Sequence, residues 1–219
     1  MDSSKIEAGL ENQGNHQETI NNFDQAIAPN PEDSEAYKKK GDFLYEAKRY
    51  DEAIECYDKA ISLKPDDFET YKKKGNSLYG LERYQEAIQS YEKAIDLKPD
   101  YADAYHNKGN CFCDLQKYNE AIESFDKAIA LDPADSINAH KVKAGCLQSL
   151  QRYDEAIECC DKVISLRPDD AEAYYLKGSN LFLSERYDEA IECCDKAIAL
   201  VPADSINAHK VKAGCLQFL

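Results

Sequence analysis

Apolar and small side chains recur along this chain at the spacing of a helix. Tyr37, Gly41 and Leu44 stand three or four residues apart, which places them on one face of a helix. After a short charged segment, a second block contains Ala53 and Tyr57 at the same kind of spacing, with charged residues between them. The pattern therefore predicts two amphipathic helices in succession, each with one buried face.

The two-helix pattern returns every 34 residues, and a proline marks each period. These prolines are Pro31, Pro65, Pro99, Pro133, Pro168 and Pro202. One interval alone is 35 residues long, and the alignment places its inserted residue within 134–139. Because proline removes a backbone donor and clashes with the preceding turn, each of these prolines is expected to end a second helix.

Small residues at fixed places predict where the helices approach one another closely. Glycine in a helix interior costs about 1 kcal/mol relative to alanine, so its return needs a geometric reason. It returns at Gly41, Gly75, Gly109 and Gly178. We expect these glycines to face a recurring alanine of the second helix, namely Ala53, Ala87, Ala121, Ala156 and Ala190.

Two further sets of residues recur with the same period. The residues expected to cap the first helices are Asp33, Asp67, Ser136, Asp170 and Ser205. The tyrosines expected to lie in the core because they return in every period are Tyr50, Tyr84, Tyr118, Tyr153 and Tyr187.

The segment Y-x-E-A-I-x-x-Y-x-K-A-I-x-L-x-P, together with the 34-residue period, resembles the tetratricopeptide repeat family. The resemblance implies an all-α fold, a right-handed superhelical solenoid of antiparallel helix hairpins in a single domain. Its five repeats would span 34–67, 68–101, 102–136, 137–170 and 171–205. Residues 1–33, with Ile6 and Leu10 in register, are expected to form a degenerate repeat that caps the chain, and 206–219 a half-repeat helix.

The resemblance also implies a function: a non-catalytic scaffold whose concave groove, lined by first helices, binds an extended peptide or a partner helix. First-helix residues that point away from the predicted core would line that groove. They are Lys38, Asp42, Tyr45, Lys72, Asn76, Tyr79, His106, Asn110, Lys141, Tyr175 and Phe182. The lysines among them predict an acidic ligand, although a charged helix face can also serve solubility alone.

One branch of the family, the co-chaperones, grips the carboxyl terminus of a chaperone with a clamp of lysines and asparagines. Lys72, Asn76 and Asn107 match the first three positions of that clamp, whereas Asn138 and Val142 depart from the last two cationic positions. The resemblance thus implies a ligand that can be the terminal peptide of a chaperone-like partner.

Composition and charge exclude several classes of protein. A net charge of -15 repels nucleic acid. The first residues lack the apolar core of a signal peptide, and no apolar run reaches the length of a membrane span. We therefore expect a cytoplasmic protein with no membrane contact. No catalytic constellation, phosphate loop or cofactor motif stands out from the repeat, so we expect no enzyme activity and no cofactor.

The nine cysteines suggest a rival function in thiol or metal chemistry. Their spacing matches no zinc site, and most replace core residues of the repeat, so we expect reduced, buried thiols and no bound metal. His140 and His209 occupy the register of Tyr37 and are expected to be buried or half-buried. Because Cys160 and Cys194 replace large tyrosines, we expect the fourth and fifth repeats to pack less well and to unfold first.

The last helix suggests a second way to bind protein. Residues 133–148 and 202–217 are identical, so the last helix copies an internal one. Its apolar side is expected to carry Ile206, His209, Ala213 and Leu216. Self-assembly through this edge is therefore the structural alternative to peptide binding.

Overall fold

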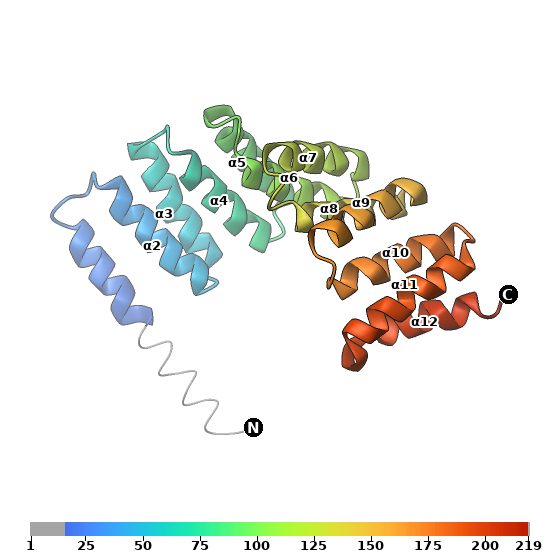
Figure 1. Cartoon of the computed structure of the whole chain (residues 1–219). Helices are drawn as coiled ribbons and strands as arrows, with labels where there is room; N and C mark the ends of the chain where they lie inside the picture. The colour runs from blue at the N-terminus through green and yellow to red at the C-terminus, as the bar shows by residue number, and fades with distance from the viewer. Residues whose placement is uncertain (1–15, 219) are drawn as a thin grey trace, which may run out of the picture. The chain divides into compact units, whose positions relative to one another are not determined.

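The computed structural model describes residues 16–218, apart from the side chain of Asp204, and the regular elements in this part of the chain are helices (Figure 1). The predicted register of Ile6 and Leu10 lies outside the described residues. The chain divides into two compact units, Met1–Asp100 and Tyr101–Leu219. The structure confirms the all-α class and the helix hairpins.

The first unit contains helix 16–27 and two hairpins. The hairpins are α2 (Ser34–Glu46) with α3 (Tyr50–Leu63) and α4 (Phe68–Gly80) with α5 (Tyr84–Leu97). Helix α3 also packs on α4, which joins the hairpins into one layered stack. The interior contains the fully buried side chains of Leu44, Tyr57, Leu78 and Tyr91.

The second unit continues the same arrangement. Its hairpins are α6 (Ala102–Asp114) with α7 (Tyr118–Leu131), α8 (Ile137–Ser149) with α9 (Tyr153–Leu166) and α10 (Ala171–Leu183) with α11 (Tyr187–Leu200). A short 3-10 turn, η1 (Pro202–Asp204), leads into α12 (Ile206–Cys215), which packs on α11 and α10. Phe125, Leu147 and Leu181 are buried in this unit.

The aspartates cap the first helices as predicted, but the serines do not. The carboxylates of Asp33 and Asp170 accept hydrogen bonds from Ala36 N and Ala173 N, and that of Asp67 accepts from two amides of α4. The hydroxyl of Ser136 instead donates to the carbonyl of Pro133, and Ser205 donates to Pro202. The serine prediction was wrong because each hydroxyl lies against the carbonyl three residues earlier and accepts no hydrogen bond from the amides of the first turn.

Three of the four recurring glycines face an aromatic ring, which corrects the predicted contact with alanine, whereas Gly178 faces Sγ of Cys194 and the backbone oxygen of Ala190. A Cβ atom added at Gly41 would lie 2.6 Å from Cε1 of Tyr57, and one at Gly75 would lie 2.5 Å from Cε1 of Tyr91. Gly109 meets Phe125 in the same way. Gly41, Gly75 and Gly109 therefore leave space for a large ring from the second helix, and this ring fills the centre of the hairpin.

Two predictions about core positions were confirmed only in part. Tyr50, Tyr84, Tyr118, Tyr153 and Tyr187 are half-buried at the start of each second helix rather than fully buried. His140 is half-buried as expected, but His209 is exposed. Tyr57, Tyr91 and Phe125, two helical turns further along the first three second helices, are the fully buried aromatic residues.

Within residues 16–218, none of the helices combines the length and the apolar character needed to cross a membrane.

Candidate functional site

The first unit has a hollow on the side formed by its first helices, with a volume of about 300 Å³. Residues of α2, α3 and α4 line it: Asp42, Tyr45, Glu46, Tyr57, Lys72, Lys73 and Asn76. We call this hollow the α2–α4 pocket. Four residues of the predicted groove, Asp42, Tyr45, Lys72 and Asn76, are thus brought together in one cavity.

Polar atoms of the α2–α4 pocket are held in place by hydrogen bonds. The hydroxyl of Tyr57 donates to Oδ1 of Asp42 over 2.9 Å, and Lys73 Nζ lies 2.7 Å from the other carboxylate oxygen. The hydroxyl of Tyr91 donates to Oδ1 of Asn76 over 2.9 Å. Burial raises the pKa of Tyr57, and the charge of Asp42 raises it further, so the hydroxyl remains a donor. The buried rings therefore fix the orientation of Asp42 and Asn76.

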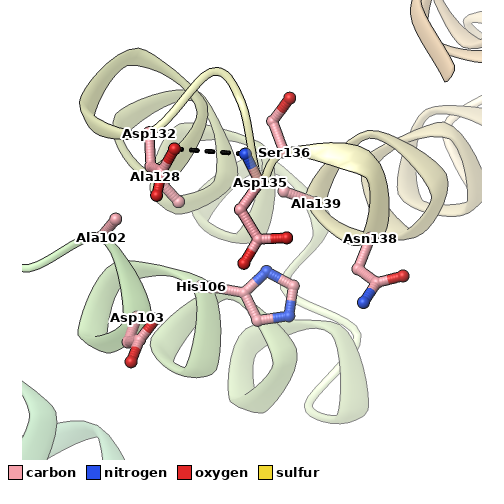
Figure 2. A pocket seen from close by; sticks show the side chains of 9 residues that line it. All are labelled: Ala102, Asp103, His106, Ala128, Asp132, Asp135, Ser136, Asn138 and Ala139. Atoms are coloured by element: carbon pink, nitrogen blue, oxygen red, sulfur yellow. Dashed lines mark hydrogen bonds between the residues drawn. The ribbon is translucent and has the colours of Figure 1, made fainter. Parts of the chain in front are cut away.

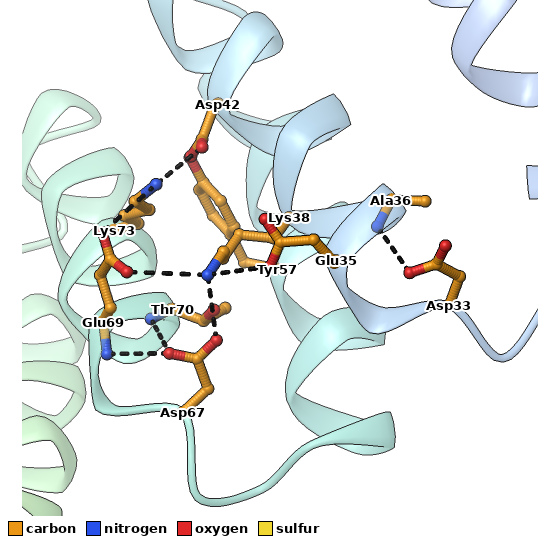
Figure 3. Close-up of polar contacts among 10 residues, drawn as sticks. All are labelled: Asp33, Glu35, Ala36, Lys38, Asp42, Tyr57, Asp67, Glu69, Thr70 and Lys73. Atoms are coloured by element: carbon orange, nitrogen blue, oxygen red, sulfur yellow. Dashed lines mark hydrogen bonds and ion pairs between the residues drawn. The ribbon is translucent and has the colours of Figure 1, made fainter. Parts of the chain in front are cut away.

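Lys38, predicted to contact a ligand, forms ion pairs with other residues of the chain (Figure 3). Its Nζ lies 3.1 Å from Glu35, 3.3 Å from Asp67 and 3.6 Å from Glu69. Burial acts to lower the pKa of Lys38, but the hydrogen bond with Glu35 and the charge of Asp67 outweigh it and raise the pKa. Lys38 thus links α2 to the start of α4 as a permanent cation.

Lys141 makes the equivalent link in the second unit. Its Nζ lies 3.2 Å from Asp170 and 2.6 Å from Glu172, at the start of α10. Sequence reasoning missed both links, although a signal exists: each lysine stands 29 residues before the aspartate that caps the next first helix. Two of the predicted groove lysines therefore join neighbouring hairpins.

The aromatic residues of the predicted groove differ in what covers them. Tyr45 packs on Tyr50 and Tyr79 packs on Tyr84, with 5.5 Å between ring centroids in both pairs, and Tyr79 is still 37% exposed. Phe182 contacts Tyr187 on one side and Phe218 on another, at 5.8 and 6.3 Å. Phe182 is therefore in contact with two other rings, whereas Tyr79 keeps part of its surface open to a ligand.

A smaller cavity of about 110 Å³ lies between α6, α7 and the turn before α8 (Figure 2). His106 and Asn138 line it together with Asp103, Asp132 and Asp135. Burial lowers the pKa of His106 despite the nearby charges of Asp103 and Asp135, so the imidazole is neutral at pH 7. The other predicted groove residues of this unit, Asn107, Asn110 and Tyr175, are half-buried and do not line this cavity.

Six of the seven free cysteines are buried, and Cys193 is half-buried. Burial raises the pKa of Cys111, Cys160 and Cys194 to about 12, which keeps these thiols protonated and poorly nucleophilic. Cys113 of α6 and Cys146 of α8 are joined in a disulfide, with their Cα atoms 6.7 Å apart. The expectation of reduced thiols was therefore wrong for this pair and agrees with the structure at the other seven cysteines. The described residues contain no cluster of three metal-ligating side chains.

Solved structures share this fold along most of the chain. YrrB, described as a TPR protein with an unusual peptide-binding site, is 28% identical, with 87% of this chain and 97% of YrrB covered at a TM-score of 0.73. The MamA protein is also 28% identical, with coverages of 76% and 91% and a TM-score of 0.72. PilF of Pseudomonas aeruginosa, 20% identical, covers 95% of this chain and 94% of its own at 0.72, which shows a shared fold. Curated proteins gave no significant match.

Family models match the repeated part of the sequence. A TPR repeat model matches residues 41–82 and 75–112, and two tetratricopeptide repeat models match residues 102–135 and 147–205. These matches coincide with the helix hairpins of both units. The chain therefore belongs to the tetratricopeptide repeat family.

Proposed function

We propose that this protein is a non-catalytic scaffold that holds an extended peptide of a partner protein in the α2–α4 pocket. The observation that carries the proposal is the α2–α4 pocket, which has a volume of about 300 Å³ and is lined mainly by side chains of first helices. Hydrogen bonds from buried tyrosines orient Asp42 and Asn76 in its lining. Prearranged polar groups reduce the entropy lost on binding. YrrB, whose description names a peptide-binding site, supports this choice of function by similarity.

The charges of the α2–α4 pocket bear on the ligand. Asp42 and Glu46 balance Lys72 and Lys73, while Lys38 is paired with carboxylates outside the lining. The balanced charges of the pocket therefore support binding of an acidic peptide terminus less strongly than the lysines in the sequence do. We propose a peptide of mixed charge, with an apolar side chain packed on the ring of Tyr45.

Capture of the partner by the immobilised chain tests this function. We expect Tyr45→Ala combined with Lys72→Ala to weaken binding of the captured partner about tenfold, a loss equivalent to about 1.4 kcal/mol. The matched control is Glu55→Ala, at an exposed position on α3 outside the pocket. Lys38→Glu is unsuitable, because it would place a fourth carboxylate among Glu35, Asp67 and Glu69.

Equal binding by the double variant and the wild type would remove the α2–α4 pocket as the site. Competition with two synthetic peptides, one uniformly acidic and one of mixed charge, distinguishes the two ligand classes. Preferential competition by the acidic peptide would contradict the mixed-charge ligand while leaving the pocket in place.

A further inference from the structure

A covalent bond joins the third and fourth hairpins of the chain. Cys113 of α6 is bonded to Cys146 of α8, at a sequence separation of 33 residues. Both helices are the first helices of their hairpins, so the bond lies between two hairpins and not within one. The next pair of first helices, α8 and α10, is linked by a hydrogen bond of 3.1 Å from Gln148 Nε2 to Ser179 Oγ. A noncovalent link is thus sufficient at one junction, whereas its neighbour has a disulfide.

The other end of this α6–α8 junction contains the cavity of about 110 Å³ (Figure 2). Its lining includes His106 of α6 and Ala139 at the start of α8. Cys113 lies about two helical turns beyond His106, and Cys146 lies about two turns beyond Ala139. Side chains that face a cavity lose the packing contacts that would otherwise hold the two elements together. The disulfide therefore fastens the junction at one end, while the packing is incomplete at the other.

The two cysteines of the disulfide differ in their access to solvent. Cys113 is half-buried, whereas Cys146 is 3% exposed. Cys113 also has the register of Tyr45 and Tyr79, on the side of the first helices that is predicted to bind a ligand. A disulfide is cleaved when a thiolate attacks one of its sulfur atoms, and access decides which sulfur is attacked. We therefore expect attack at Sγ of Cys113, with Sγ of Cys146 as the leaving group.

The free cysteines near the disulfide do not compete with it. Cys159 and Cys160 lie in the same buried cluster as Cys146, and Cys111 stands two residues before Cys113. Burial raises the pKa of Cys111 and Cys160 to about 12, and it also raises the pKa of Cys159. A protonated thiol is a poor nucleophile toward a disulfide. Exchange therefore stays confined to Cys113 and Cys146.

We propose that Cys113 and Cys146 form a reversible redox modification site, which a dithiol reduces and a low-molecular-weight disulfide oxidises. In reduction, a thiolate of the dithiol bonds to Sγ of Cys113, the S–S bond of the chain breaks, and Cys146 leaves as a thiolate that takes up a proton. The second thiol of the reductant then attacks the sulfur of the first, which releases Cys113 as a thiol. The chain gains two electrons and two protons, and the dithiol becomes a disulfide.

Reduction at this site loosens the attachment of the fourth hairpin. The α6–α8 junction then loses its covalent link and keeps the cavity. The fourth hairpin, α8 with α9, has the small side chains of Ala144 and Cys160 at its centre. Its amides should consequently open to solvent more often when the disulfide is reduced. The proposal does not depend on the α2–α4 pocket, whose lining residues belong to the first unit.

Peptide mapping of the full chain tests the chemistry. One sample is treated with oxidised glutathione, a second is then reduced with dithiothreitol without denaturant, and both are quenched in acid and digested without reductant. We expect a peptide pair linked through Cys113 and Cys146 after oxidation, and at least about a tenfold loss of this pair after reduction. Absence of the linked pair in the oxidised chain would overturn the proposal. So would a linked pair that dithiothreitol removes only in the presence of denaturant.

Hydrogen exchange of the oxidised and reduced wild type tests the consequence. Amides of α8 and α9 should exchange at least about tenfold faster after reduction. Cys113→Ser should exchange like the reduced wild type, with or without dithiothreitol. Cys193→Ser is the matched control, because it makes the same substitution at a half-buried free cysteine and should keep the response to dithiothreitol. Equal exchange of α8 and α9 in the oxidised and reduced wild type, which needs no variant, would overturn the proposed loosening.

Discussion

At the scale of single residues, each hairpin is built around one contact between a small residue and a larger one. Gly41 with Tyr57, Gly75 with Tyr91 and Gly109 with Phe125 leave no space for an added Cβ atom. In the hairpin of α8 and α9, Ala144 stands where the others have glycine, and the buried Cys160 stands where they have a ring. In this hairpin the larger small residue occurs with the smaller partner, whereas the α10–α11 hairpin keeps Gly178 opposite Cys194.

The contact between Gly75 and the ring of Tyr91 predicts that one substitution has different effects in two backgrounds. Gly75→Ala should destabilise the wild type by about 1–3 kcal/mol, because the methyl group collides with the buried ring of Tyr91. In a Tyr91→Cys background the same change should cost less, since the collision with the ring is gone and alanine is the better helix former. Guanidinium denaturation of the four proteins measures both effects. An equal cost in both backgrounds would contradict the proposed contact.

His106 provides a prediction about pH. Burial lowers its pKa in the folded chain below the ordinary value of about 6.5. The unfolded chain therefore binds a proton more readily, and the free energy of unfolding should fall as the pH drops below about 6.5. His106→Phe keeps the ring contact with Phe125 and removes the titration.

Between about pH 7.5 and 5.5, the wild type should thus lose more stability than His106→Phe. The carboxylates and His140 are common to both proteins, so their contributions cancel in the comparison. Identical pH profiles in thermal or chemical denaturation would show that His106 titrates alike in the folded and unfolded chain.

At the scale of elements, the turn between the two helices of a hairpin has a recurring conformation. Lys48, Glu82, Gln116, Gln151 and Glu185 all have φ between 57° and 62°. In the second hairpin, Arg83 N then donates to Leu78 O over 2.9 Å, which closes the end of α4. This left-handed conformation favours glycine, yet none of these five positions has one.

Glu82→Gly should therefore raise the free energy of unfolding by about 0.5–1 kcal/mol, because it relieves the Cβ strain of the left-handed residue. Glu82→Ala is the control: it removes the same charged group and keeps the Cβ atom. A gain in stability that is equal for alanine and glycine would attribute the effect to lost charge instead of backbone strain.

The helix hairpins, their caps and their contacts differ in how well the sequence predicts them. The helical periodicity and the recurring prolines predicted the helix hairpins. The aspartates before the first helices were recognisable as caps, because capping depends on residues only a few positions apart. The bridges of Lys38 and Lys141 were missed because each spans 29 residues and depends on how neighbouring hairpins stack. The glycine contact was assigned to the wrong partner because spacing defines a face but not the rotation of the facing helix.

At the scale of the whole molecule, the two units differ in the size of their central side chains. The first has Tyr57 and Tyr91 at the centre of its hairpins, whereas Cys160 and Cys194 occupy these places in the last two hairpins. In repeat proteins the stability is close to the sum of the contributions of single repeats and of their interfaces with neighbouring repeats.

The repeat boundaries and the right-handed superhelical path stay predictions from the sequence.

The smaller centres predict an order of unfolding. Amides of α9 and α11 should exchange with deuterium faster than those of α3 and α5, because a cysteine buries less apolar surface than a tyrosine. Hydrogen exchange read by mass spectrometry gives the order. Greater protection of α9 and α11 would contradict the prediction that the later hairpins open first.

The most direct test of the central claim is to identify which surface touches the captured partner. A photo-crosslinking amino acid can replace Tyr45 or Lys72 in the lining of the α2–α4 pocket, or Glu55 on the exposed side of α3. If the scaffold holds a peptide in the α2–α4 pocket, the partner should crosslink strongly at 45 and 72, through one short segment of its sequence, and not at 55. Crosslinks at 55 with none at 45 or 72 would contradict the account.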